Sequence, residues 1–196
     1  MYGGEILLLT QQRNKRKVYY FNSADGFCAY QFSKTLGELI QALDKTSEEI
    51  VFLCIGSDRA TGDSLGPIIG YKLSEQKYRN YMIYGTLDEP VHAKNLRETI
   101  TKIKEMHKDS IIIAIDASLG TSNHVGFITL GEGPLKPGAG VSKDLPAVGD
   151  LFITGIVNFS GLLDNMLLQT TRLNIVMKLA DCICLGIRFC LPLRAN

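Results

Sequence analysis

Apolar residues along this chain recur at two spacings, and the alternation between them predicts strands and helices in turn. Continuous apolar runs, which suit strands covered on both faces, occupy residues 49–56 and 110–118. Shorter apolar runs predict five further strands, at 5–10, 17–21, 81–85, 124–130 and 150–157. The first two of these short strands are predicted to form a hairpin around a basic turn at residues 13–17.

Helical spacing predicts the remaining elements. Leucine and isoleucine fall on one face of a helix over 33–43, and a second helix over 93–108 has the same pattern. Further helices are predicted at about 64–77 and, as one long apolar helix, at about 161–191. Strands that alternate with helices indicate an α/β three-layer sandwich with a mostly parallel sheet, formed as a single domain by residues 1–196.

In such a sheet, chemistry gathers beyond the carboxyl ends of the strands. The loop after the first long strand, "IGSDRATGDSLGP", superficially resembles a phosphate-binding loop. However, five residues separate Gly56 from Gly62 where that loop needs four, and Asp63 replaces the lysine. A negative charge at that position would repel a phosphate, so phosphate binding is excluded.

Two aspartates are the candidate reactive groups. Asp63 suits a helix N-cap, which still places its carboxylate at the mouth of the crevice, while Asp58 suits an exposed turn. Asp116 follows the apolar run 111–115, so it must be paired, hydrogen-bonded or raised in pKa unless it caps the next loop. Two strand-end carboxyl groups that share a proton can activate water as a base and protonate a leaving group as an acid.

Composition narrows the classes of function. The 21 basic and 20 acidic residues leave a net charge of +1, which argues against a nucleic-acid partner bound by bulk electrostatics. The five cysteines form no CxxC pair and are expected to be buried free thiols in a reducing compartment. The N-terminus does not read as a signal peptide, and charges interrupt the apolar C-terminal stretch, so we expect a cytoplasmic protein without a membrane span.

Four motifs carry a resemblance to a known family: "GSDRATGDSLGPIIGYKL", "YGTLDEPVHAKNL", "IIIAIDASLG" and "PLKPGAGVSKDLPAVGD". Together, over about residues 50–156, they resemble the YyaC-type sporulation proteins of spore-forming bacteria. That family is in turn similar to the spore germination protease, which degrades small acid-soluble spore proteins. Its "TPDALGP"-like, "IDAL"-like and "PGSGVG"-like stretches read here as "TGDSLGP", "IDAS" and "PGAGVS". The "TPD" proline is Gly62 in this chain.

The resemblance implies an aspartic-type endopeptidase of sporulation or germination, located in the forespore or spore core. It places the two catalytic aspartates at Asp63 and Asp116, the positions that the pattern also selects. A protein or peptide is the implied substrate, with small acid-soluble spore proteins as candidates, and no cofactor is implied. The residues expected to bind or orient substrate are Gly56, Ser57, Asp58, Arg59, Thr61, Gly62, His92 and His124.

The same fold also resembles the hydrogenase maturation proteases, a phosphorylase/hydrolase-like architecture. Two of their metal ligands would correspond to Asp63 and Asp116, and the third is a histidine at a later strand end. The corresponding stretch here, "AVGDLFITGIVNFSG", contains no histidine, so the metal-free mechanism is favoured.

Three functions stay open from the sequence: an aspartic peptidase, a metal-dependent peptidase, and a non-catalytic binding or regulatory protein on the same fold. The apolar surface of the last helix suits the interface of a homo-oligomer as well as it suits core packing.

Overall fold

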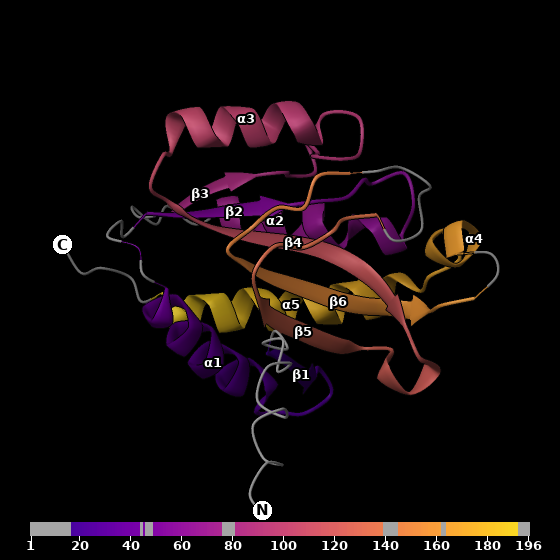
Figure 1. Ribbon diagram of the computed structural model, residues 1–196. Helices are drawn as coiled ribbons and strands as arrows, with labels where there is room; N and C mark the ends of the chain where they lie inside the picture. The colour runs from indigo at the N-terminus through magenta and orange to yellow at the C-terminus, as the bar shows by residue number, and fades with distance from the viewer. Residues whose placement is uncertain are drawn as a thin grey trace, which may run out of the picture.

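The computed structural model describes residues 17–43, 45, 49–75, 81–138, 145–161 and 164–191. In this part of the chain, six strands form one sheet in the order β1-β5-β6-β4-β2-β3 (Figure 1). The strands are β1 (Val18–Asn22), β2 (Ile50–Cys54), β3 (Tyr81–Tyr84), β4 (Ile111–Gly120), β5 (Phe127–Glu132) and β6 (Leu151–Phe159). The helices are α1 (Cys28–Ala42), α2 (Leu65–Ser74), α3 (Leu96–Met106), α4 (Asp164–Gln169) and α5 (Leu173–Cys190).

The predicted α/β three-layer sandwich is confirmed. Helices α1 and α5 lie on one face of the sheet and α3 lies on the other (Figure 1). Strands β2, β3, β4 and β6 run parallel, while β5 runs antiparallel to both of its neighbours, β1 and β6. Strand β2, between β4 and the edge strand β3, is buried along its whole length, as its unbroken apolar run requires.

The order of the strands changes direction between β2 and β4. The chain leaves the carboxyl end of β2 through α2 toward β3, whereas it leaves the carboxyl end of β4 toward β5 and β6, on the other side of the sheet. This is the topological switch point at which open α/β sheets bind their ligands.

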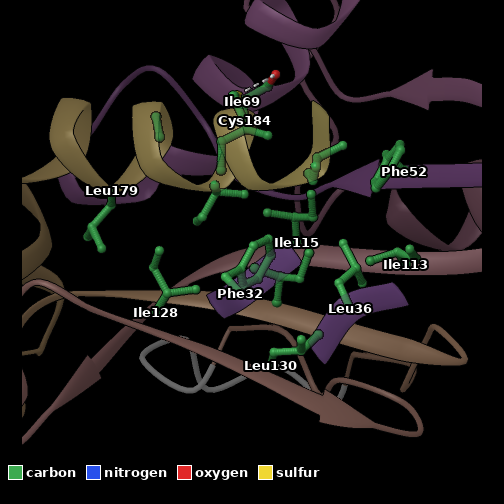
Figure 2. Packing of buried hydrophobic residues seen from close by; sticks show 14 of the residues in the cluster. Phe32, Leu36, Phe52, Ile69, Ile113, Ile115, Ile128, Leu130, Leu179 and Cys184 are labelled. Atoms are coloured by element: carbon green, nitrogen blue, oxygen red, sulfur yellow. Dashed lines mark hydrogen bonds between the residues drawn. The ribbon is translucent and has the colours of Figure 1, made fainter. Parts of the chain in front are cut away.

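Alternating side chains of the strands build two hydrophobic cores. In the larger core, Ile113 and Ile115 of β4 pack with Phe32 of α1 and Leu179 of α5 (Figure 2). In the smaller core, Ala114 packs with β2 and α3 residues on the opposite face. Residues of β4 with even numbers therefore face the α3 side, a parity that matters for Asp116.

Two of the predicted elements lie near the ends of the chain. The predicted strand at 5–10 and most of the basic turn lie outside the described residues. The single long helix at 161–191 is wrong, because α4 ends at Gln169 and α5 starts at Leu173. The hydroxyl groups of Thr170 and Thr171 donate to carbonyl oxygens of α4, and these side-chain bonds compete with continuation of the helix.

Two other element boundaries differ from those predicted from the sequence. Helix α1 starts at Cys28, five residues before the predicted helix, and β5 starts at Phe127 rather than at residue 124. A 3-10 turn, Ser122–His124, takes up the residues in front of β5. Among the described helices, none is long and apolar enough to cross a membrane.

Candidate active site

Asp116 lies where β4 loses its pairing with β2. The ladder between these strands ends at Cys54 opposite Ile115, while β4 stays paired with β6 and continues to Gly120. Asp116 is therefore inside a strand rather than at its end, which corrects the sequence-based placement. Its side chain shares the α3 face with Ala114 and is only 6% exposed.

The loop after β2 folds back so that Asp63 returns to the end of this strand. The amide of Ser57 donates to the Asp63 carbonyl at 3.0 Å. Gly56 has a φ of 144°, and a Cβ at this position would collide with the same carbonyl. A residue with a side chain would therefore open the turn, so the glycine is required by close approach as well as by its backbone conformation.

Asp63 is not a helix N-cap, contrary to one interpretation of the sequence. It lies inside the 3-10 turn Gly62–Ser64, which runs directly into α2. Neither the turn nor α2 has a side-chain hydrogen bond at its N-cap. Gly62 is buried against α4, where a Cβ would come within 2.8 Å of the Leu168 carbonyl oxygen. Its missing side chain lets α4 close behind the turn.

The two carboxyl groups are near enough to influence each other. Burial and, after it, the negative charge of Asp63 raise the pKa of Asp116 to about 8, against hydrogen bonds from the backbones of Ala117 and Gly138. Burial also raises the pKa of Asp63 to about 6, against a hydrogen bond from the Ser57 backbone and the charge of His92. At neutral pH the pair therefore holds one proton, mainly on Asp116.

The two predicted histidines are placed very differently. His92 lies close enough for its charge to act on Asp63, and its Nδ1 is buried without a hydrogen-bond partner in the described structure. Its backbone is held by Asn95, whose Oδ1 accepts from the His92 amide at 2.8 Å. The amide of Gly56 donates to the Val91 carbonyl, which ties this segment to the loop after β2.

His124 is not brought to the aspartates. It is exposed, contacts Thr121 through Nδ1 at 3.1 Å, and its ring packs on Tyr20 and Phe127. Tyr20 is reached from Asp116 by stepping across the paired residues Thr154 and Thr129. Tyr20 and Asp116 are therefore three strand spacings apart, about 14 Å. His124 packs on Tyr20, so it does not lie beside the carboxyl groups.

The other predicted residues form the loop around Asp63. Asp58 and Arg59 are exposed at its tip, and the Arg59 amide donates to the Ser57 hydroxyl at 3.3 Å. Thr61 caps the 3-10 turn through its carbonyl, which accepts from the Ser64 hydroxyl at 2.6 Å. These residues surround the buried pair, and their predicted role in binding substrate stays a prediction.

Sequence reasoning missed a row of hydroxyl groups beside Asp116. Ser118 donates to Thr154 at 3.1 Å, and Thr154 is 2.6 Å from the hydroxyl oxygen of Thr129. Register places Thr154 directly opposite Asp116 and on the same face. A threonine within the apolar run 151–157 was the available signal, but strand order was needed to place it next to the site.

A protein metal site needs several ligating side chains close together. Within the described ranges, no group of three or more His, Cys, Asp or Glu side chains is arranged to hold a metal ion. At this site the charge of His92 lowers the pKa of Asp63, and the charge of Asp63 raises the pKa of Asp116.

The family model described as "Protein of unknown function (DUF1256)" matches residues 20–186. The chain belongs to this family. It is also 45% identical over 181 residues to "Uncharacterized protein YyaC" of Bacillus subtilis (strain 168), covering 92% of this chain and 86% of that protein. The matched region contains Asp63, Asp116 and the whole loop between β2 and α2.

Among solved structures, the chain is similar to the [NiFe] hydrogenase maturation protease HycI from Thermococcus kodakarensis KOD1. The similarity has a TM-score of 0.41 and 15% sequence identity, and covers 76% of this chain and 98% of that protein. A likeness at this level does not indicate a shared activity.

Proposed function

We propose that this DUF1256 protein is an aspartic-type endopeptidase in which Asp63 and Asp116 activate a water molecule. One observation carries the proposal: burial and the like charge of Asp63 raise the pKa of Asp116 to about 8, and burial raises that of Asp63 to about 6, so the two carboxyl groups hold one proton between them at neutral pH. Ionisable groups that structure alone requires are normally paired with an opposite charge, whereas this pair combines burial with like charge.

The proposed chemistry divides the roles by protonation state. The Asp63 carboxylate takes a proton from water as the water oxygen attacks the peptide carbonyl carbon, while Asp116 gives its proton to the carbonyl oxygen. Asp63 then passes its proton to the leaving nitrogen as the C–N bond breaks, and Asp116 recovers its own from the collapsing intermediate. The pair returns to its starting state with one proton.

The resemblance to the germination protease supports a protein substrate, and small acid-soluble spore proteins are the first candidates. It also supports action during sporulation or germination, in the forespore or spore core. Gly56, Ser57, Thr61 and Gly62 surround Asp63, and we propose that their backbone groups orient the substrate chain.

The test is incubation of the purified protein with small acid-soluble spore proteins, followed by intact-mass measurement over time. Asp63→Asn and Asp116→Asn run beside the wild type, each with and without chelator, and Asp150→Asn serves as the carboxylate control, because Asp150 pairs with Lys45 away from the two aspartates. Discrete fragments from the wild type and Asp150→Asn alone, unchanged by chelator, support the proposal.

Loss of cleavage with chelator, restored by a divalent ion, would instead favour the metal-dependent peptidase. Equal cleavage by all variants would remove the two aspartates from the mechanism. Binding of the spore proteins without cleavage by any form would favour the binding protein.

A further inference from the structure

The first and last long helices carry two cysteines whose sulfur atoms meet. The Sγ atoms of Cys28 on α1 and Cys182 on α5 lie 3.0 Å apart, although the residues are 154 positions apart in the sequence. An S–S bond is about 2.0 Å long, so about 1 Å of approach separates this contact from a covalent link. Neither cysteine belongs to the crevice between β2 and β4.

The contact is part of a close helix pair. Helices α1 and α5 run in the same direction, since Cys28 meets Cys182, Phe32 meets Gly186 and Gly37 meets Cys190. A Cβ on Gly186 would collide with the Phe32 ring, so the glycine sets the short distance between the helices. The packing therefore holds the two sulfur atoms together without needing a bond between them.

The contact shifts the pKa values of its two thiols in opposite directions. The hydrogen bond from Cys182 lowers the pKa of Cys28, against burial and the nearby charge of Asp25. The same hydrogen bond and burial raise the pKa of Cys182. Burial raises the pKa of Cys190 to about 11 and that of Cys184 to about 12, which makes these two poor nucleophiles.

The pKa shifts and the exposure give each member of the pair a role. Cys28 lies at the first turn of α1, where the helix amides favour a thiolate, and the thiolate is the form that attacks a peroxide. Cys182 is partly exposed and touches Cys28, so peroxide enters from its side and the Cys182 sulfur resolves the oxidised Cys28.

We propose that Cys28 and Cys182 are a redox modification site that forms a reversible disulfide between α1 and α5. With hydrogen peroxide as the oxidant, the Cys28 thiolate attacks one peroxide oxygen, the O–O bond breaks, and a sulfenic acid forms as one water is released. The Cys182 sulfur then attacks the Cys28 sulfur, the S–O bond breaks, and a second water leaves. The two thiols thus lose two protons and two electrons to one peroxide, and a thiol reductant reverses the change.

The experiment treats the folded protein with hydrogen peroxide, removes the peroxide, unfolds the protein and alkylates all free thiols. The expected result is three alkylated cysteines of the five, full recovery of five after reduction, and a peptide containing Cys28 linked to one containing Cys182. Closing so long a loop raises the melting temperature by about 5–10 °C in the oxidised form.

Cys28→Ser and Cys182→Ser each remove the linked peptide, while Cys190→Ser, on the same helix, retains it. Five alkylated cysteines in the peroxide-treated wild type, a linked peptide between other cysteines, or irreversible oxidation of Cys28 would overturn the proposal. The wild-type peptide map decides the matter even where a serine variant does not fold.

Discussion

Two aspartates on the paired strands β4 and β6, one inside β4 and one directly before β6, have very different surroundings. Asp150, just before β6, pairs with Lys45 at 2.7 Å and accepts a hydrogen bond from the Ile112 amide at 2.8 Å. Asp116, on β4, is nearly fully buried, and the charge that shifts its pKa is the like charge of Asp63. Asp150 is built for structure, whereas the surroundings of Asp116 oppose its ionisation.

Asp150 is thus a carboxylate that stabilises the folded state, whereas the ionised form of Asp116 would destabilise it. A paired, hydrogen-bonded carboxylate lowers the free energy of the folded state. A buried carboxyl group near a like charge does the opposite once it ionises, and such groups cluster at functional sites. Replacing each aspartate in turn is therefore the direct way to test the comparison.

The largest expected effect is on cleavage. Asp63→Asn or Asp116→Asn removes a group that takes part in proton transfer, so we expect the rate to fall by about 10²–10⁴-fold. Asp150→Asn, directly before β6, is expected to stay within a few-fold of the wild-type rate. Initial rates of fragment formation measure all three, and a comparable loss in Asp150→Asn would cancel the distinction between the two aspartates.

The pH dependence of cleavage is the next effect in size. The proposed mechanism requires Asp63 to be ionised and Asp116 to be protonated, and their pKa values are raised to about 6 and about 8. The rate should therefore follow a bell-shaped profile with its maximum near pH 7, falling about tenfold per pH unit beyond either limb. A rate that is flat between pH 5 and pH 9 would contradict a shared proton.

The two aspartates should also differ in their effect on stability. Because the pKa of Asp116 is higher in the folded state, the folded protein binds more protons than the unfolded chain. Stability from this group is therefore present below about pH 4 and falls by about 1.4 kcal/mol per pH unit until about pH 8. Asp116→Asn should gain stability relative to the wild type as the pH rises through this range, by several degrees in melting temperature.

Asp150→Asn should have the opposite sign. It loses the ion pair with Lys45 and weakens the hydrogen bond from Ile112, so we expect a loss of about 1–2 kcal/mol at neutral pH. Thermal melts of both variants between pH 4 and pH 8 measure the two effects together. Destabilisation by Asp116→Asn at pH 8 would mean that its hydrogen bonds outweigh the cost of burial.

The smallest expected effect comes from His92. Its charge lowers the pKa of Asp63, so His92→Ala should move the acidic limb of the pH profile upward by less than about one unit. His124→Ala is the matched control, because this ring packs on Tyr20 away from the pair, and it should leave both limbs unchanged. Equal shifts in the two variants would place His92 outside the site.

Local pattern predicted most of the described elements and both central aspartates. The apolar run of β2 and the glycine at position 56 are local requirements, so they can be identified before any contact is known. The break between α4 and α5 was missed because Thr170 and Thr171 suit a helix by spacing and end it through side-chain bonds. The row from Ser118 to Thr129 was missed because it crosses strands.

The sequence by itself determined the periodicity of strands and helices, the turn that returns Asp63 to the end of β2, and the candidate pair. The elements and the turn depend on residues that are neighbours along the chain, and each aspartate was selected by the apolar strand that precedes it. Only the tertiary structure decided that His92 joins the pair and His124 does not, and that Cys28 meets Cys182. Those contacts depend on the order of strands in the sheet and on how closely α1 and α5 pack, which long-range packing energy selects and no local spacing encodes.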